Sequence, residues 1–130
     1  MNEPGDRILV VDDDPSVRRG QERLLRSAGF RVATFASVQA LLTDADLESA
    51  ACLVLDVRLP GQSGLDLQAS LALDGVHIPI VFITGHGDVQ MAVRAMKAGA
   101  VDLLAKPFDD QELFLAIDLA RRQESRRGAV

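Results

Sequence analysis

Aspartate residues stand at the ends of two apolar runs in this 130-residue chain, where they could bind a cation and a phosphate group. Asp12, Asp13 and Asp14 follow the run ILVV, and Asp56 follows the run CLVL. Carboxylates that converge in a small site repel one another unless a cation neutralises them, and hard oxygen ligands favour Mg²⁺ or Ca²⁺. Mg²⁺ suits an open cluster because it keeps several waters and accepts phosphate oxygens as ligands. One of these carboxylates could also act as a nucleophile and form an aspartyl phosphate.

Two further polar residues, Thr84 and Lys106, end or follow neighbouring apolar runs. A hydroxyl donor and a fixed positive charge could both contact the oxygens of a phosphoryl group. Each of the polar residues named so far has an ordinary structural explanation when it is taken alone. An aspartate after a strand, for example, is a common helix cap, which is the role we expect for Asp14. Their joint occurrence at the ends of four runs favours a functional site.

These residues must be positioned by strands that alternate with helices. Continuous apolar runs are typical of strands buried on both faces, and Pro, Gly and Ser residues mark the turns between them. The predicted strands cover residues 8–11, 31–35, 51–56, 78–84 and 101–105. The predicted helices run from Pro15 to a stop at Gly29, from a Ser37 cap to about Leu47, over 65–73, from about Val89 to Gly99, and from a cap at Asp109 or Asp110.

The inner faces of three helices follow from apolar residues at helical spacing. These are Val17, Leu24 and Ala28; Val89, Ala92, Val93 and Met96; and Leu113, Ala116, Ile117 and Ala120. Five strands, each separated by a helix, predict an α/β fold with a five-stranded parallel sheet, doubly wound, in the flavodoxin-like arrangement of five βα repeats. Ligands of such sheets bind at the carboxyl ends of the strands, where all the polar residues described above fall.

Composition excludes several other classes of protein. A net charge of −5 opposes direct binding to nucleic acid, and no apolar run approaches the roughly 20 residues that cross a bilayer. We expect a cytoplasmic protein with no membrane partner, since the N-terminus lacks the apolar segment of a secretory signal. The single cysteine, Cys52, is expected in the core. The sequence contains no glycine-rich phosphate loop and no Ser-His-Asp candidate set.

Four segments, in order ILVVDDD, LVLDVRLPGQSG, VFITGHGD and DLLAKPF, give the chain a family resemblance. It resembles the receiver domain of bacterial two-component response regulators over about residues 7–120. The run ITGHGDVQMAVRAMKAGAVDLLAKPF is further similar to the FixJ-like branch, whose receivers usually precede a helix-turn-helix domain. Residues 1–6 then form an N-terminal extension, and 121–130 form a tail or the start of a linker.

The resemblance implies a Mg²⁺-dependent phosphorylation site. Asp56 matches the residue that accepts the phosphoryl group from a sensor histidine kinase. Asp12 and Asp13 match the acidic pair, with Asp13 as a direct Mg²⁺ ligand and Asp12 acting largely through water. The backbone carbonyl of Arg58 matches the third protein ligand.

The resemblance also implies a switch. Thr84 matches the hydroxyl that moves towards the phosphoryl group, Lys106 matches the lysine that pairs with it, and Pro107 matches a proline usually preceded by a cis bond. The family often has an aromatic residue where this chain has Leu103, which carries no hydroxyl and less surface area. We therefore expect the output to depend more on the surfaces of the last two helices.

The Arg58 and His86 side chains could affect the lifetime of the phosphoryl group. They stand two positions after the acceptor and two positions after the threonine, and they could shield the phosphoryl group from water and lengthen its lifetime; alternatively, both are solvated loop residues.

The last helix has more apolar surface than the sheet can cover. Phe114, with Leu115 and Leu119, adds this apolar area, so part of it is expected at the surface. With Leu103, it would form the face of a phosphorylation-dependent homodimer.

The resemblance implies a phosphorylation-activated switch rather than an enzyme that turns over a free substrate, and it implies control of transcription through an effector domain outside this chain. One alternative is a stand-alone receiver that acts through protein–protein interaction, and another is an interaction module with a vestigial site. A third is a haloacid-dehalogenase-type phosphotransferase with Asp12 as nucleophile. Ser16 departs from the Thr or Val usual in that class, and Asp56 would have no role there.

Overall fold

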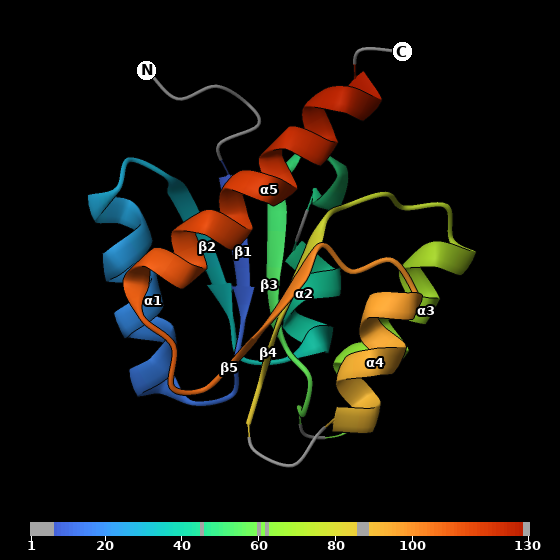
Figure 1. Cartoon of the computed structure of the whole chain (residues 1–130), viewed down its shortest axis with the longest axis horizontal. Coiled ribbons are helices and arrows are strands. Elements are labelled where there is room, and N and C mark those ends of the chain that lie inside the picture. The colour runs from blue at the N-terminus through green and yellow to red at the C-terminus, as the bar shows by residue number, and fades with distance from the viewer. Residues whose placement is uncertain (1–6, 45, 60, 62, 86–88, 129–130) are drawn as a thin grey trace.

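Five parallel strands form one sheet in the order β2-β1-β3-β4-β5 (Figure 1). In the computed structural model the described residues are 7–44, 46–59, 61, 63–85 and 89–128. The strands are β1 (Arg7–Val11), β2 (Arg31–Phe35), β3 (Cys52–Asp56), β4 (Ile80–Thr84) and β5 (Asp102–Ala105). The helices are α1 (Pro15–Ser27), α2 (Val38–Asp44), α3 (Gly64–Leu73), α4 (Val89–Lys97) and α5 (Asp110–Gly128), with a 3₁₀ turn η2 (Leu47–Ser49). The predicted fold class is confirmed.

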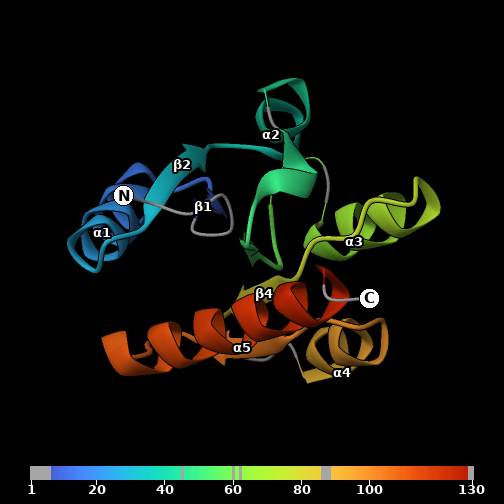
Figure 2. The same ribbon diagram turned by 90° about the horizontal axis from the view of Figure 1, so that it is seen from above.

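Helices cover both faces of the sheet, with α1 and α5 on one side and α2, α3 and α4 on the other (Figure 2). Side chains that alternate along each strand therefore enter two separate cores. Along β3, Cys52 and Val54 pack with α1 and α5, whereas Leu53 and Leu55 pack with α2 and α3. This burial on both faces explains why the strands read as continuous apolar runs.

Local capping fixes where the helices nearest the acidic residues begin. The Asp14 carboxylate accepts hydrogen bonds from the backbone N–H groups of Ser16 and Val17, so Asp14 is the N-cap of α1, as expected. At α3, Ser63 and Asp66 form a capping box in which each side chain accepts from the backbone of the other residue. The starts of α1 and α3 are thus fixed by side chains in the loops that follow β1 and β3.

The predicted inner face of α5 is confirmed, and that of α4 is wrong. Leu113, Ala116, Ile117 and Ala120 are fully buried. In α4, by contrast, Val89 is 72% exposed, Val93 46% and Met96 44%, and among the nine residues of α4 only Ala95 is buried. Helical spacing identifies an apolar stripe but does not determine whether the sheet or another surface covers it. The stripe of α4 faces outward.

The inner side of α4 packs against α3 through Ala95. Ala95 packs in the core shared with α2 and α3, where half-buried Met91 joins it. The buried Gln68 side chain of α3 donates a hydrogen bond from Nε2 to the carbonyl oxygen of Ala95, over 3.1 Å. The helix is therefore held against α3 by Ala95, Met91 and one cross-helix hydrogen bond, and it also contacts β5.

Other predicted bounds and faces also change. In α1 the buried residues are Gln21 and Leu25, whereas Val17 and Leu24 are half-buried and Ala28 is exposed. The second helix ends at Asp44 instead of about Leu47, and η2 follows it. β4 begins at Ile80 rather than at 78, because Pro79 has no N–H group to donate to the sheet.

The C-terminal helix continues beyond the region of the resemblance. α5 extends to Gly128, so residues 121–128 prolong the helix. The Arg121 guanidinium lies 5.5 Å from the centre of the Phe30 ring and ties this part of α5 to the turn after α1. Within the described part of the chain, no helix combines the length and apolar character needed to cross a membrane.

Candidate functional site

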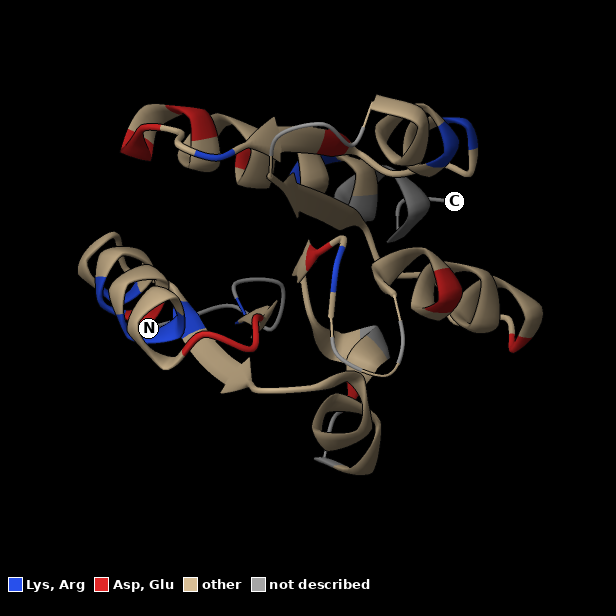
Figure 3. Cartoon of the chain, turned by 90° about the horizontal axis from the view of Figure 1, so that it is seen from below, with Lys and Arg blue, Asp and Glu red and all other residues tan. Residues whose placement is uncertain are grey.

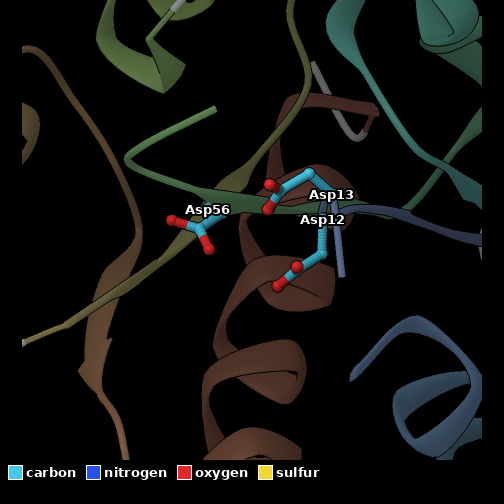
Figure 4. A group of neighbouring side chains, drawn as sticks. All are labelled: Asp12, Asp13 and Asp56. Carbon is cyan, nitrogen blue, oxygen red and sulfur yellow. The ribbon is translucent and has the colours of Figure 1, made fainter. Parts of the chain in front are cut away.

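The carboxyl ends of the strands bring the predicted site residues to one edge of the sheet. Asp12 and Asp13 follow β1, Asp56 ends β3, Thr84 ends β4 and Lys106 follows β5. Figure 4 shows the carboxylates of Asp12, Asp13 and Asp56 turned towards a common space. One oxygen from each carboxylate lies within 4.8 Å of the others. Three aspartates from two strand ends thus form a single acidic cluster.

Asp12 is fixed in place by its surroundings. Its side chain is 3% exposed; Oδ1 accepts a hydrogen bond from Asp14 N at 2.9 Å, and Oδ2 lies 3.5 Å from Lys106 Nζ. Its backbone N–H donates to Phe35 O at 3.1 Å, and its carbonyl accepts from Arg18 Nη1 at 2.7 Å. Both oxygens of its carboxylate and both of its backbone polar groups therefore have partners, while the neighbouring Asp13 is exposed.

Asp56 ends β3, and its carboxylate is held by two donors. Its side chain is 13% exposed; Oδ1 accepts from the backbone N–H of Arg58 at 2.9 Å, and Oδ2 accepts from Lys106 Nζ at 3.2 Å. Burial raises the pKa of Asp56 above its ordinary value, and the Arg58 N–H and Lys106 offset this only in part. The Asp12 carboxylate pushes the pKa further up.

Lys106 pairs with two carboxylates of the cluster. Partial burial acts to lower the pKa of Lys106, but the carboxylates of Asp56 and Asp12 outweigh it, and the net shift of the pKa is upward. The ammonium therefore stays charged near neutral pH. The Lys106–Pro107 peptide bond is cis.

Thr84 is buried beside these charged groups and connects to them through the backbone. Its hydroxyl donates to the carbonyl of Gly85 at 3.2 Å, and its own carbonyl accepts from Lys106 N at 2.8 Å. Thr84 and Lys106 are therefore neighbours across the β4–β5 ladder. His86, which the sequence also suggested, lies outside the described residues.

Gly64 allows α3 to begin directly against the back of Asp56. A methyl group added at Gly64 would lie 2.6 Å from the carbonyl oxygen of Asp56 and 2.9 Å from Cε1 of Phe82. Its N–H donates to Val57 O at 2.8 Å. The sequence predicts a helix that begins only at residue 65, after Gly64, and does not predict this contact. The contact depends partly on Phe82 of β4, which is distant from Gly64 in the sequence.

Sequence reasoning also missed Arg18, whose contact with the backbone of Asp12 is described above. Its signal was weak, because Arg18 is one of four arginines in α1 and only its place in the first turn distinguishes it. Figure 3 shows the acidic segment after β1 running beside the basic residues of α1.

The donor set fits a hard divalent cation. Asp12, Asp13 and Asp56 supply carboxylate oxygens, the ligands that Mg²⁺ and Ca²⁺ prefer, and Lys106 offsets only one of the three charges. A cation would therefore relieve the remaining repulsion. The exposure of Asp13 leaves one side of the cluster open to solvent and phosphate.

One groove lies away from the acidic cluster and another borders it through Lys106. One, of about 430 Å³, lies between α4 and β5 and is lined by Ala92, Val93, Met96, Lys97, Asp102 and Leu103. The other, of about 850 Å³, separates α1 from the start of α5; apolar residues including Val17, Leu24, Phe108 and Leu113 line it, with Arg23, Lys106 and Asp110 among its charged residues.

The predicted output residues lie outside the acidic cluster. Leu103 is half-buried and packs with the core beneath α4, and half-buried Phe114 packs with the core beneath α5. Leu115 is 63% exposed and Leu119 46%, so the expected surplus of apolar area on α5 is confirmed.

Comparison with known proteins gives consistent matches. The family model described as response regulator receiver domain matches residues 8–118. Nodulation protein W of Bradyrhizobium diazoefficiens is 53% identical over 92% of this chain and 53% of its own length. The transcriptional regulatory protein FixJ of the same species is 47% identical over 89% of this chain and 57% of its own length.

Comparison with solved structures also identifies response regulator receiver domains. The crystal structure of FixJ-N is 41% identical, covers 94% of this chain and 96% of that one, and has a TM-score of 0.85. The response regulator StyR is 50% identical and covers 95% of this chain and 62% of that one, with a TM-score of 0.87. The chain spans about half the length of the curated relatives it matches.

Proposed function

The chain belongs to the response regulator receiver domain family and is similar to its FixJ-like members, and on that premise we propose that Asp56 accepts a phosphoryl group from a sensor histidine kinase. The chain is a phosphorylation-activated signal receiver of a two-component system. The observation that carries the residue assignment is the position of Asp56, whose carboxylate lies 3.2 Å from the Lys106 ammonium and within 4.8 Å of the carboxylate oxygens of Asp12 and Asp13.

In the proposed reaction, an oxygen of the Asp56 carboxylate forms a bond to phosphorus while the bond between phosphorus and the kinase imidazole nitrogen breaks. That nitrogen keeps the electron pair of the broken bond. Asp13 and Asp56, with the Arg58 carbonyl, would hold Mg²⁺ directly, and Asp12 would act largely through water. The bound Mg²⁺ would offset the negative charge of the carboxylates and the phosphoryl oxygens.

Thr84 and Lys106 turn the new charge into a change of conformation. The Thr84 hydroxyl leaves the Gly85 carbonyl and donates to a phosphoryl oxygen, while Lys106 pairs with another. Because the two residues are linked through the β4–β5 backbone, both respond to the same group. The movement of Thr84 frees space towards Leu103, which shifts in place of the aromatic residue usual in the family.

Arg58 and His86 would set the lifetime of the phosphoryl group. The Arg58 N–H already contacts Asp56, so its exposed side chain starts next to the acceptor and can shield it from water. The Arg58→Ala variant is expected to lose phosphate faster than the wild type, and the double variant with His86→Ala faster still. Unchanged decay of labelled protein would contradict this role.

The kinase is proposed to bind over the groove between α1 and α5. This groove borders the site through Lys106 and combines an apolar floor with Arg23 at its side, which suits an amphipathic helix carrying acidic residues. The approach would bring a phosphohistidine to the open side of the cluster.

The phosphorylated domain is proposed to dimerise through α4, β5 and α5. The exposed stripe of α4 and the exposed Leu115 and Leu119 of α5 supply apolar surface, with Arg94 and Lys97 at its edge. Leu103 and Phe114 lie beneath this surface and would transmit the change at the site.

Transcription control is proposed as the output. FixJ is named a transcriptional regulatory protein, and this chain matches about half of it, so a further effector domain would read the dimer. The alternative is a stand-alone receiver that acts by protein–protein contact alone.

Labelling with a small phosphodonor in the presence of Mg²⁺ tests the acceptor. Acid-labile phosphate is expected on the wild type and absent from the Asp56→Asn variant. Label on Asp12 would instead favour the dehalogenase-type reaction, which the contacts of Asp12 oppose, because both of its carboxylate oxygens already have partners. Full labelling of Asp56→Asn would overturn the assignment.

A further inference from the structure

Arg18 reaches back from α1 to the backbone of the acidic segment. Its Nη1 atom donates to the carbonyl oxygen of Asp12 at 2.7 Å, and the side chain is half-buried. The base of this side chain is fixed as well, since Arg18 N donates to Asp14 O at 3.0 Å in the first turn of α1. The guanidinium is thus held on a rigid element and bonded to the peptide group that follows β1.

That peptide group joins Asp12 to Asp13. Because a peptide unit is planar, a hydrogen bond to the Asp12 carbonyl also fixes the direction in which the main chain enters Asp13. The Asp12 N–H, on the preceding peptide, is already bonded to β2 through Phe35 O. Arg18 therefore fixes the orientation of the last peptide before the exposed carboxylate of Asp13.

The positive charge of Arg18 allows two possible roles of this residue in metal binding to be distinguished. A guanidinium stays protonated at all accessible pH values, and a positive charge beside a cation site opposes cation binding. If Arg18 acted only through its charge, its removal would strengthen metal binding. If it acts by positioning Asp13, its removal weakens metal binding. The two roles predict opposite signs.

We propose that Arg18 is a positioning residue for the divalent-ion site, which holds the Asp12–Asp13 peptide so that the Asp13 carboxylate meets the ion. The proposal rests on the proposed function, because it assumes that the acidic cluster binds Mg²⁺. It assigns to the first turn of α1 a part in metal affinity besides that of the carboxylates. The residue contacts the backbone rather than the ion.

Isothermal titration of the full chain with Mg²⁺ alone tests the proposal. Arg18→Ala is expected to weaken Mg²⁺ binding by about 10-fold, the scale typical for residues that orient metal ligands. Arg19→Ala is the matched control, because it removes the same charge from the next residue of α1, which is exposed. It is expected to bind Mg²⁺ as tightly as the wild type or more tightly. Arg18→Lys, which keeps the charge and a donor, should recover part of the affinity.

A kinetic measurement separates positioning from general damage to the fold. With a small phosphodonor, Arg18→Ala should need more Mg²⁺ for half-maximal labelling but reach the wild-type rate at saturating Mg²⁺. If Arg18→Ala does not fold, Arg18→Met, which keeps an aliphatic side chain but has no donor, takes its place. Mg²⁺ affinity of Arg18→Ala, or of Arg18→Met in its place, at or above that of Arg19→Ala would overturn the proposal. Absence of Mg²⁺ binding by the wild type would instead overturn the proposed function.

Discussion

The ammonium nitrogen of Lys106 lies 3.2 Å from Oδ2 of Asp56, yet this pairing does not bring the pKa of Asp56 down to its ordinary value. Burial and the neighbouring Asp12 outweigh the cation. The charged form of Asp56 is therefore less stable in the folded protein than in the unfolded chain, where the same carboxyl is in water.

The first prediction concerns stability and pH. Because the pKa of Asp56 is higher in the folded state, the folded state binds more protons there, and wild-type stability falls as pH rises through that pKa. The Asp56→Asn variant avoids this cost and is expected to be more stable at pH 7 by about 0.5–2 kcal/mol, the usual size of such gains. The difference should shrink as the pH falls towards 3.8, the ordinary value for aspartate.

Urea unfolding of both proteins between about pH 4 and pH 8, in the absence of Mg²⁺, measures this difference. Asp118→Asn serves as the control, since it also removes one negative charge, from an exposed pair with Arg122 on α5. Equal stabilisation by both substitutions would mean that net charge alone is responsible.

A second prediction tests the contact between α3 and the acceptor strand. The Gly64→Ala variant must place a methyl group 2.6 Å from a backbone oxygen that cannot move without moving Asp56. We expect a loss of about 1–3 kcal/mol of unfolding free energy, typical of overpacking. Gly20→Ala in α1 meets no described atom within 4 Å and should instead gain about 0.5–1 kcal/mol. Thermal unfolding compares the stabilities of the two variants. Stabilisation by both substitutions would show that α3 can move away from Asp56 at little cost.

A third prediction concerns the reactivity of Cys52. Burial raises the pKa of this thiol to about 12, so that at pH 8 only about one molecule in 10⁴ carries the reactive thiolate. Iodoacetamide should not label the folded protein on the timescale that labels a small-molecule thiol. Labelling in urea should follow the fraction unfolded, and rapid labelling of native protein would contradict the buried position.

Dimerisation provides the fourth prediction. With beryllofluoride as a mimic of the phosphoryl group, the wild type should sediment as a dimer. Val93→Glu, which places a charge in the exposed stripe of α4, should remain a monomer. Leu73→Glu is the control, because Leu73 is 88% exposed at the end of α3, on a different helix. A monomeric wild type after activation would refute the dimer, and equal effects of both substitutions would refute this face.

The sequence predicts the site better than it predicts the helix faces. Buried parallel strands are apolar throughout, so their ends are marked sharply, and the residues that follow them meet at one edge by geometry alone. The strand ends are therefore sufficient to predict that Asp12, Asp56, Thr84 and Lys106 lie together.

The buried faces of helices are harder to predict from sequence, because an apolar stripe can face either the sheet or the outside of the domain. In α5 the stripe with Leu113 faces the sheet, whereas in α4 the stripe with Val93 faces outward and the small Ala95 makes the contact. Burial of Gln21 instead of Val17 in α1 is the same kind of error, since the residue type did not reveal its position. Such choices depend on neighbouring elements, as does the fit of Gly64 against Asp56.

The hydrogen bond from Gln68 to Ala95 has an energetic consequence. It is worth about 0.5–1.5 kcal/mol and is one of the contacts, with the burial of Ala95 and Met91, that a displacement of α4 away from α3 would give up. A charge-assisted hydrogen bond formed at a phosphoryl group supplies about 1.5–3 kcal/mol, so phosphorylation can offset the loss of that contact. We therefore expect phosphorylation to change how often α4 occupies a position in which this hydrogen bond is broken.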